Sequence, residues 1–445
     1  LSVAGLSTNY DTGWGSVVNS LGYARFAADD ENQDATVAFA SAFGRFLHLT
    51  SPPIAYEAVN QSPESKKLTD ELRFTSIRMN HFLWQVGLFH THENVTFPHL
   101  LEAISFPRDV PLPAPINPLL NAQQSGSYSE YVGFGDLTYY LTDALDATAG
   151  VRYSHNQQHD FGFSLGALGE GSTATVAQNF SDSDTNYLFD LRWRPTQQVS
   201  TYLRAASAYR PGGPTNVALP GVPTSFGPDT DWVYEVGAKG RWLDGALNSN
   251  VAVYYIDWKD IQIATIFNGV ASIVSNAGNA KSEGVEFDGT YEPVRGLVFG
   301  ATASYDEAVV TSANPTNTAG ARAGDPLPYT PKWSGAITAD YSFPITPYLK
   351  GGLGASWAYQ GWGYSSFSAN TMDTREVIPS YALVGVRGHL DWSRYSAAVN
   401  VNNLANKRTF TDVELVRLFA NQPVPYAYAY PLQPLTVRLT LSAKF

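Results

Sequence analysis

The last eleven residues of the chain alternate without a break between apolar and polar side chains. The apolar set is Leu435, Val437, Leu439, Leu441, Ala443 and Phe445, and the intervening positions hold Thr, Arg, Ser and Lys. A period of two predicts a β-strand with one apolar face. Soluble proteins usually shorten or charge a strand at a free edge. This pattern therefore predicts that the apolar face meets an apolar medium and that the edge pairs with another strand.

Similar alternation recurs along the chain, with Gly, Asn, Asp and Pro between the segments. Each segment has about the length that a tilted strand needs to cross a bilayer. The fifteen clearest segments are 68–76, 82–90, 131–141, 145–154, 185–193, 200–210, 233–242, 246–258, 282–291, 297–306, 333–343, 348–359, 381–390, 395–404 and 435–445.

The connections between these segments alternate between short and long. Seven are tight, at 77–81, 142–144, 194–199, 243–245, 292–296, 344–347 and 391–394. The long ones are roughly 91–130, 155–184, 211–232, 259–281, 307–332, 360–380 and 405–434. This rhythm predicts an all-β fold, a transmembrane antiparallel β-barrel with short periplasmic turns and long extracellular loops. Closure of the barrel would pair the last strand with an earlier one.

Composition narrows the remaining classes. The chain has 445 residues, no cysteine, 15% charged and 13% aromatic residues, a mean hydropathy of -0.17 and a net charge of -12. No run of ~20 apolar residues is present, so a helical membrane protein is excluded, whereas a large soluble β protein is not excluded by composition alone. The absence of cysteine rules out thiol catalysis and cysteine metal sites. The negative charge makes nucleic acid an improbable partner.

Several stretches resemble the barrel of TonB-dependent outer-membrane receptors. They are KKLTDELRFTS with FLWQVGLFHTHEN, YEVGAKGRWLDGALNSNVAVYYIDWKDIQ, NAGNAKSEGVEFDGTYEPVRGLVFGATASYD, LPYTPKWSGAITADY, VNNLANKRTF and the terminal LTVRLTLSAKF. The resemblance covers about residues 66–445. It implies a bacterial outer-membrane location, capture of small-molecule cargo by external loops, uptake driven by the TonB complex through a plug, and contact with lipid and lipopolysaccharide. It also implies that the terminal Phe445 is read by the assembly machinery.

Two departures from the family pattern bear on the domain organisation. Nothing in the sequence resembles the family's plug domain, and family barrels have about 22 strands where this chain has room for ~16–18. We assign 66–445 to the transmembrane barrel and 1–65 to N-terminal strands and loops, with 34–49 as the best candidate strand and 1–33 and 50–65 as loop. Either the plug and first strands lie elsewhere, or this is a shortened plugless barrel.

Candidate cargo-binding residues lie in predicted external loops. YRPGGPTN (209–216) resembles a stretch near the family's extracellular rim, where Tyr209 and Arg210 could contact an anionic cargo. Trp362 and Tyr364 in YQGWGYSSF, and the tyrosines of PYAYAYP (425–431), could stack on planar cargo or sugar rings. Turn formation and loop packing are the competing explanations.

Histidine and acidic clusters are expected to be solvated rather than metal-binding. His90 and His92 share the parity of Trp84, Val86 and Leu88, which places them on the outer surface above the bilayer. His155 and His159, together with the acidic clusters 29–34 and 181–186, are expected in loops. Calcium, or calcium-bridged lipopolysaccharide, is the alternative for the acidic clusters. No metal site and no cofactor is predicted.

Common enzyme motifs are absent: we find no G-x-S-x-G, Walker A, H-E-x-x-H or C-x-x-C, so we expect no catalytic residues. The expected function is TonB-energised uptake of a scarce nutrient such as a ferric siderophore. The alternative is a plugless passive channel or a structural outer-membrane barrel within a larger assembly.

Overall fold

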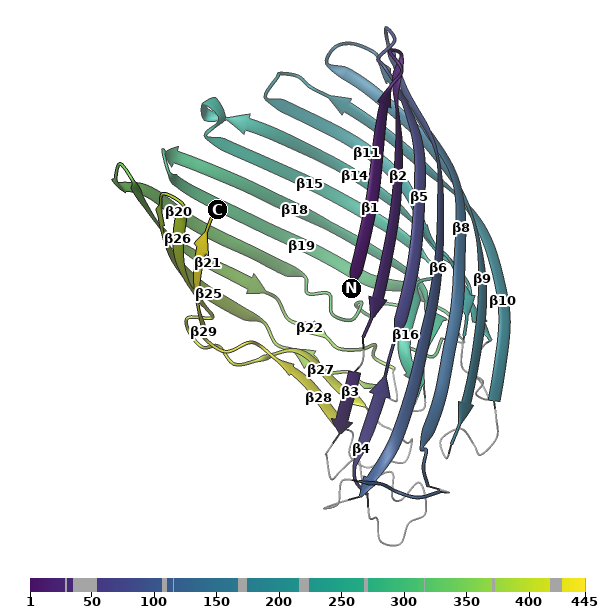
Figure 1. Ribbon diagram of the computed structural model, residues 1–445. Helices are drawn as coiled ribbons and strands as arrows, with labels where there is room; N and C mark the ends of the chain where they lie inside the picture. The colour runs from purple at the N-terminus through teal and green to yellow at the C-terminus, as the bar shows by residue number, and fades with distance from the viewer. Residues whose placement is uncertain are drawn as a thin grey trace.

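Nearly all the regular structure of the chain is β-strand, as a computed structural model shows (Figure 1). The structure describes residues 1–28, 30–34, 54–105, 110–114, 116–166, 174–215, 224–267, 271–315, 317–369, 373–416 and 426–444. The one helical element among them is a single turn, Leu243–Gly245. In the described ranges no helix is long and apolar enough to cross a membrane.

Twenty of the described strands form one antiparallel sheet. Seventeen follow one another as its wall. In spatial order they are β1 (Ser2–Asp11), β2 (Gly15–Ala27), β5 (Glu64–Ser76), β6 (Phe82–Ser105), β8 (Leu120–Tyr140), β9 (Leu145–Leu165), β10 (Ala174–Trp193), β11 (Val199–Arg210), β14 (Asp229–Trp242), β15 (Leu247–Lys259), β18 (Gly278–Val294), β19 (Leu297–Ala313), β20 (Trp333–Thr346), β21 (Leu349–Gln360), β25 (Tyr381–Trp392), β26 (Tyr395–Asn402) and β29 (Thr436–Ala443).

Shorter strands lie beyond one end of this wall. β3 (Asp30–Asp34), β4 (Ile54–Gln61) and β7 (Val110–Pro111) extend the main sheet beside β6. Four small sheets stand apart, made of β12 (Gly213–Pro214) with β13 (Ser225–Phe226), β16 (Gln262–Phe267) with β17 (Ala271–Asn276), β22 (Gly363–Tyr364) with β24 (Val377–Ile378), and β23 (Asp373–Thr374) with β27 (Phe410–Val416) and β28 (Tyr426–Pro431).

All fifteen predicted crossing segments are strands of the wall, and the seven predicted tight turns connect them at one end. The backbone of these turns explains their residues. At 243–245 three successive residues have positive φ, and Gly245, at +91°, is the residue type that reaches this region without strain. We call the opposite end of the wall, where the longer connections lie, the loop rim.

The expectation that 1–33 and 50–65 are loop is wrong. Residues 1–33 hold β1, β2 and most of β3, and residues 50–65 hold β4 and the start of β5. β1 and β2 pair along their whole lengths, and β2 pairs with β5. The candidate strand 34–49 lies outside the described residues apart from Asp34, the last residue of β3.

The expectation of long loops at 91–130 and 155–184 is also largely wrong. β6, β8, β9 and β10 each run for 20 to 24 residues and stay paired well past the length of a bilayer crossing. His90 and His92 therefore lie on β6, and His155 and His159 lie on β9 rather than in a loop. The backbone ladder continues here because each strand's N–H and C=O groups find partners on a neighbour.

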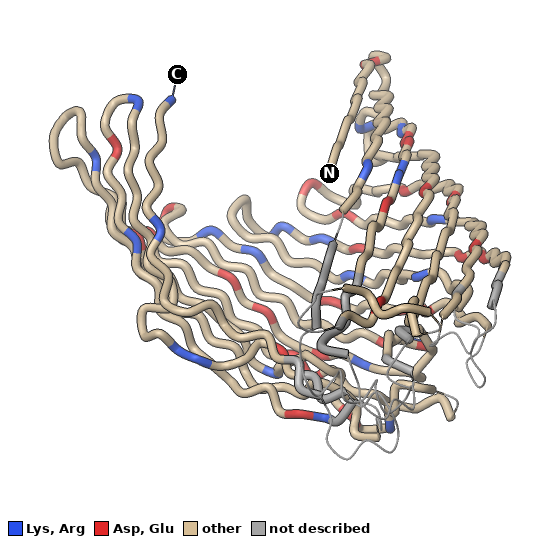
Figure 2. Tube along the Cα trace, turned by 60° about the horizontal axis from the view of Figure 1, so that its bottom comes forward, with Lys and Arg blue, Asp and Glu red and all other residues tan. Residues whose placement is uncertain are grey.

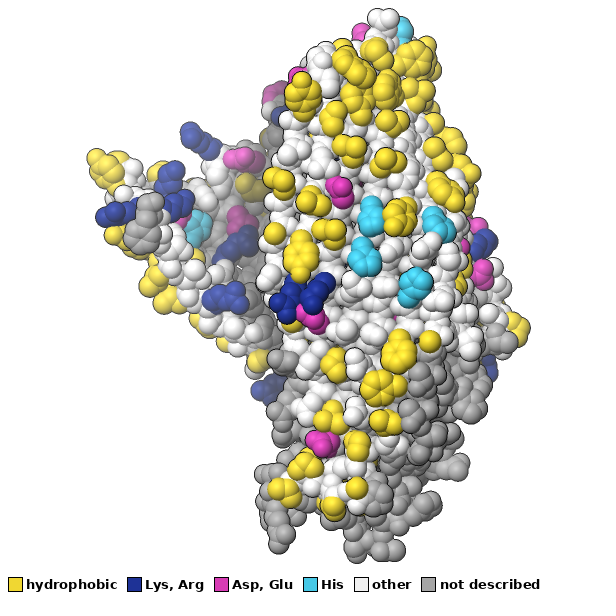
Figure 3. Space-filling model, turned by 45° about the vertical axis from the view of Figure 1, so that its right-hand side comes forward, with side chains coloured by type: hydrophobic (Ala, Val, Ile, Leu, Met, Phe, Trp, Pro, Cys, Tyr) yellow, Lys and Arg dark blue, Asp and Glu magenta, His cyan; other side chains and the backbone are white. Residues whose placement is uncertain are grey.

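The two faces of the wall differ in the way the alternation predicts. Leu203, Val236, Val253 and Val285 form one cross-strand row and are 54%, 48%, 45% and 42% exposed. Apolar side chains cover the outer face of the wall on the side seen in Figure 3. The apolar rows thus form an outer belt, and the polar alternates, such as Arg204 and Glu235, lie on the inner face.

The wall curves round toward its two end strands. In Figures 1 and 2 the N- and C-termini lie on the two opposite edges of the curved sheet, at β1 and β29. In the described ranges β1 pairs only with β2, and β29 only with β26. A pairing that joins β29 to β1 is not among the described ones, so the predicted closure stays a prediction.

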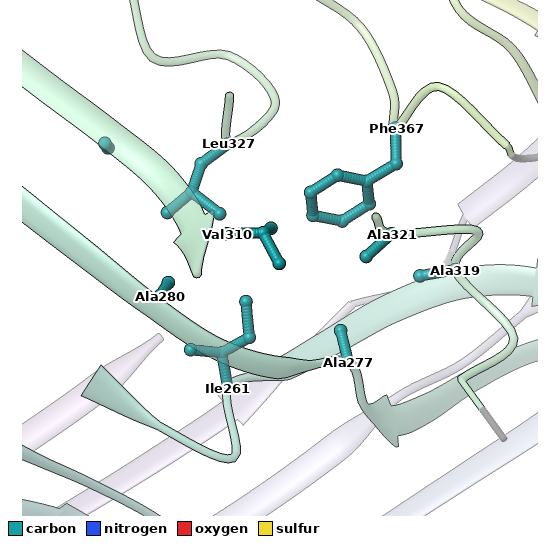
Figure 4. Packing of buried hydrophobic residues seen from close by; sticks show 9 residues of the cluster. Ile261, Ala277, Ala280, Val310, Ala319, Ala321, Leu327 and Phe367 are labelled. Carbon is teal, nitrogen blue, oxygen red and sulfur yellow. The ribbon is translucent and has the colours of Figure 1, made fainter. Parts of the chain in front are cut away.

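A compact apolar cluster lies at the loop rim, away from the belt. Phe367 is 2% exposed and packs with Val310, Leu327 and Ile261 (Figure 4). Its other members are Ala277, Ala280, Ala308, Ala319 and Ala321. The cluster joins the connection after β15, the connection after β19 and the connection after β21, so these three segments form one packed body.

Candidate functional site

The predicted pair Tyr209–Arg210 ends β11 at the loop rim. Arg210 is opposite Asp229, the first residue of β14. Its Nε donates to Asp229 Oδ1 at 3.2 Å, and its Nη2 donates to Oδ2 of the same carboxylate. The Asp229 side chain is only 4% exposed, whereas that of Arg210 is 52% exposed. The guanidinium is therefore held by the wall while one side of it faces solvent.

Gln262 completes this contact from the start of β16. Its backbone N–H donates to Asp229 Oδ2 at 3.1 Å, and its backbone oxygen accepts from Arg210 Nη2 at 3.1 Å. Its side-chain amide donates to the carbonyl oxygens of Pro211 and Gly227, at 2.9 and 3.0 Å. The three residues Arg210, Asp229 and Gln262, which we call the rim clamp, fasten the β16–β17 hairpin to the wall.

Tyr209 points toward the neighbouring strands β9 and β10. Its hydroxyl accepts from Asn156 Nδ2 at 2.7 Å and donates to Asp182 Oδ2 at 3.2 Å. The register of β10 with β11 ends at Leu188 and Ala206, whereas β11 stays paired with β14 through Tyr209 and Arg210. Both partners lie on strands, which corrects the expectation that the acidic cluster 181–186 is a loop.

Trp362 and Tyr364 lie together on the connection that follows β21. Their rings meet edge to face, with centroids 5.3 Å apart. Trp362 is 52% exposed, but one face of Tyr364 is already covered, because the guanidinium carbon of Arg375 lies 3.5 Å from its ring centroid. Of the two predicted stacking residues, Trp362 is thus the one with surface available to a ligand.

Arg375 is in turn tied to the buried Asp325. Its Nη1 lies 3.5 Å from Asp325 Oδ1, and Asp325 Oδ2 accepts from the Ser368 hydroxyl at 2.8 Å and from the Ser368 backbone N–H at 3.2 Å. Ser368 follows Phe367 of the apolar cluster. The aromatic pair Trp362–Tyr364 is therefore linked through Arg375, Asp325 and Ser368 to the apolar cluster, which we call its support.

The same support reaches the rim clamp. Ile261, in the apolar cluster, precedes Gln262 of the clamp, and Ile261 N–H donates to the Gly278 oxygen at 2.7 Å. Figure 4 shows Ile261, Val310 and Phe367 converging from their separate segments. The structure thus joins Arg210 and Trp362, which are far apart in sequence, through one continuous set of contacts.

Below the rim, several polar and charged residues of the inner face are paired. Tyr202 donates to Glu235 at 2.5 Å, Arg152 Nη2 lies 2.9 Å from Glu130, and Arg387 Nε lies 2.7 Å from Asp340. Figure 2 shows acidic and basic residues on many strands of the wall. The inner face is polar and hydrogen-bonded, as expected of a wall that borders water.

The remaining sequence-based candidates have mixed outcomes. His90 and His92 are on the outer face, as expected. Within the described ranges no three or more His, Cys, Asp or Glu side chains are grouped as metal ligands. The segment 425–431 holds the strand β28 rather than a loop. Phe445 lies outside the described residues, so its role in assembly stays a prediction.

Sequence reasoning missed Asp229, Gln262, Asp325 and Arg375. Arg210 meets Asp229 across 19 residues and Gln262 across 52. No local motif encodes such separations. The one available signal was that Asp229 begins an alternating segment just beyond a turn-rich stretch.

The family model and the curated relatives that match this chain are all named as receptors. The family model "TonB dependent receptor-like, beta-barrel" matches residues 2–404. Among curated relatives, the pesticin receptor of Yersinia enterocolitica is 29% identical over 178 residues, which is 39% of this chain and 25% of that protein. The metal-pseudopaline receptor CntO of Pseudomonas aeruginosa is 28% identical over 221 residues, 49% of this chain and 29% of that protein.

Solved structures show the same fold. The ferric yersiniabactin uptake receptor FyuA of Yersinia pestis superposes with a TM-score of 0.78 at 18% identity, covering 100% of this chain and 61% of that one. The ferric-catecholate import receptor Fiu of E. coli K12 gives 0.75 at 17% identity, covering 100% and 64%. This chain thus spans under two thirds of those receptors' length and under a third of the two curated relatives.

Proposed function

We propose that this chain, which belongs to the family of TonB-dependent receptor-like β-barrels, is the transmembrane wall of a receptor for energised uptake of a scarce nutrient such as a ferric siderophore. The protein is an outer-membrane protein, and the apolar belt is the surface that faces lipid. The family and the structural neighbours are transport receptors.

The names of the relatives support a metal chelate as the cargo class. FyuA is described as a ferric yersiniabactin receptor, Fiu as a ferric-catecholate receptor and CntO as a metal-pseudopaline receptor. A catecholate, the group named for Fiu, is a planar aromatic anion. An indole face and a guanidinium recognise such groups by stacking and by charge-assisted hydrogen bonds.

The observation that carries the proposal is the supported position of Trp362 at the loop rim. A mobile, exposed aromatic side chain must be ordered when a ligand binds, and the free-energy cost of ordering it lowers the affinity for the ligand. Here Arg375, Tyr364 and the cluster around Phe367 fix the segment beforehand. We propose Trp362 and Arg210 as the cargo contacts. Tyr364, packed against Trp362, and Tyr209, next to Arg210, help to position them.

Uptake of radioactive iron by cells that carry the complete receptor gene tests this function. We expect a deletion strain to lose uptake of one siderophore from a panel, and the restored gene to recover it. Dissipating the proton gradient, or removing TonB, is expected to abolish that uptake while surface binding persists. Uptake that continues without TonB would favour the passive channel, and unaltered uptake of every siderophore and metal tested would refute the proposal.

A further inference from the structure

Arg210 keeps two unused donors after its contacts with the protein are counted. A guanidinium carries five N–H groups in one plane, one on Nε and two on each Nη. Nε and Nη2 donate to the Asp229 carboxylate, and Nη2 also donates to the Gln262 backbone oxygen. Within the described residues Nη1 makes no hydrogen bond. Its two hydrogens are therefore available on a side chain that is 52% exposed.

The Gln262 oxygen decides what these two hydrogens can hold. A guanidinium binds a carboxylate or phosphate most strongly through two parallel N–H groups, from Nε and one Nη or from both Nη atoms. Asp229 occupies the first of these pairs. The second pair needs the remaining hydrogen of Nη2, which the Gln262 oxygen accepts at 3.1 Å. Arg210 is thus left with bonds from Nη1 alone, which suit a single oxygen atom.

Gln262 is fixed in this position by three further hydrogen bonds. Its side-chain amide donates to the Pro211 and Gly227 oxygens at 2.9 and 3.0 Å, and its backbone N–H donates to Asp229 at 3.1 Å. The preceding residue, Ile261, is fully buried in the apolar cluster. The blocked pair of donors is therefore a built-in property of the rim clamp.

The charges of β14 also disfavour an anion at this place. The charge of Arg210 is matched by Asp229, whose side chain is 4% exposed. Asp231 lies two residues further along β14 and therefore on the same face. Its Oδ1 is buried without a hydrogen-bond partner, and in the described ranges it forms no ion pair. An anion bound to Arg210 would meet this uncompensated carboxylate.

The neighbouring segments add negative rather than positive charge. The connections 211–228 and 260–280, which flank the clamp, contain no lysine or arginine, and the second begins with the exposed Asp260. On β10, Asp182 accepts from the Tyr209 hydroxyl at 3.2 Å. Lys259, at the end of β15, is already paired with Asp257 at 2.8 Å. The carboxylates around Arg210 thus outnumber the cations.

We propose that Arg210 selects cargo presenting an uncharged carbonyl oxygen, such as an amide oxygen on the surface of an electroneutral metal chelate. Nη1 donates to that oxygen, while Gln262 and Asp229 keep the guanidinium from binding an anion through two parallel bonds. The inference rests on the proposed function. It narrows the cargo class from metal chelates in general to uncharged ones.

Binding of two matched ferric chelates to the complete receptor tests this selection. The probes are the ferric complexes of desferrioxamine B with its terminal amine acetylated or succinylated. The first is uncharged and the second carries one carboxylate, while the metal-binding groups are the same. We expect the Kd of the succinyl chelate to be about three- to ten-fold higher, the size of one unit-charge repulsion near a protein surface. High salt should shrink this difference.

Asp231→Asn removes one carboxylate and leaves the contacts of the rim clamp in place. We expect it to bring the two Kd values closer together by weakening the repulsion of the succinyl chelate, with the Kd of the acetyl chelate unchanged. The matched control is Asp244→Asn, which makes the same charge change in an exposed tight turn at the other end of the wall. Its Kd ratio should equal that of the parent.

A succinyl chelate that binds as tightly as the acetyl chelate would overturn the inference and leave the uptake function standing. The same holds for a Kd ratio that Asp231→Asn does not change. Should neither probe bind, the siderophore identified by the uptake assay decides: an uncharged chelate supports the inference, and an anionic one overturns it. Uptake of no siderophore or metal at all would refute the proposed function, and the inference with it.

Discussion

Arg210 and Asp229 are opposite each other at the loop ends of β11 and β14, and the arginine holds a carboxylate that is almost wholly buried. Gln262 binds both of them. The residue that the sequence marked as a cargo contact is therefore also part of the connection between the wall and a hairpin. Altering Asp229 removes this connection and also releases the guanidinium that it holds, so an Asp229 variant tests the connection and not the proposed cargo contact.

Asp229→Ala should loosen the β16–β17 hairpin without unfolding the wall. It leaves the Gln262 N–H without its acceptor, which costs about 1–3 kcal/mol. We expect hydrogen exchange to speed up in residues 262–267 and 271–276 and to stay unchanged in β20 and β21. Asp288→Ala is a suitable control, since Asp288 is exposed and its described hydrogen bonds are those with Asn250. Faster exchange throughout the wall would contradict a local role.

Trp362→Ala should weaken cargo binding while stability is preserved. Loss of one stacked aromatic contact corresponds to about a ten-fold higher Kd. The measurement is titration of the complete purified receptor with the siderophore identified by the uptake assay. Trp14→Ala removes an equally exposed tryptophan at the tight-turn end and should leave the Kd unchanged. A Kd that is the same in parent and Trp362→Ala would exclude Trp362 as a contact.

Phe367→Ala should open the support beneath the aromatic pair. Removing a fully buried phenyl ring costs about 3–5 kcal/mol, most of it from the cavity that remains. We expect proteases added to intact cells to cut the segments 307–332 and 360–380 faster. Phe189→Ala, which removes a lipid-facing ring 51% exposed, is the control and should not alter cutting. Resistance equal to that of the parent would show that the cluster does not hold these segments.

Val236→Arg tests the membrane-facing assignment of the outer belt. Val236 lies in the middle of the apolar row, and a lipid-facing arginine near the bilayer midplane costs about 2–4 kcal/mol. The free energy of unfolding in lipid vesicles should fall by that amount. Asn250→Arg places the same group on the inner face beside Asp288 and should change stability little. An equal loss in both variants would contradict the two-faced wall.

The fold was predictable from sequence wherever one face of a strand is apolar. β29 shows why: its residues Val437, Leu439 and Leu441 are all strongly exposed, so lipid contact keeps the alternation strict. β1 and β2 were missed because Ser, Gly, Asn and Ala interrupt their apolar positions. The parts of β8 and β9 near the loop rim were missed because the sequence does not alternate there. Beyond the bilayer, water borders both faces, and backbone pairing alone maintains the strand.

The candidate site was predictable in its residue types but not in its connections. Trp362 and Arg210 are each about half exposed, and their role as cargo contacts stays a prediction. That Arg375 would cover Tyr364, and that Asp229 would hold Arg210, depends on segments brought together only by the packing around Phe367.

The paired charges of the inner wall have a consequence for anything that travels along it. Arg152 is matched by Glu130, and Arg387 by Asp340, so at these two places a solute would meet a compensated pair of charges. Each such pair attracts a charged solute less than a lone ion at the same place would.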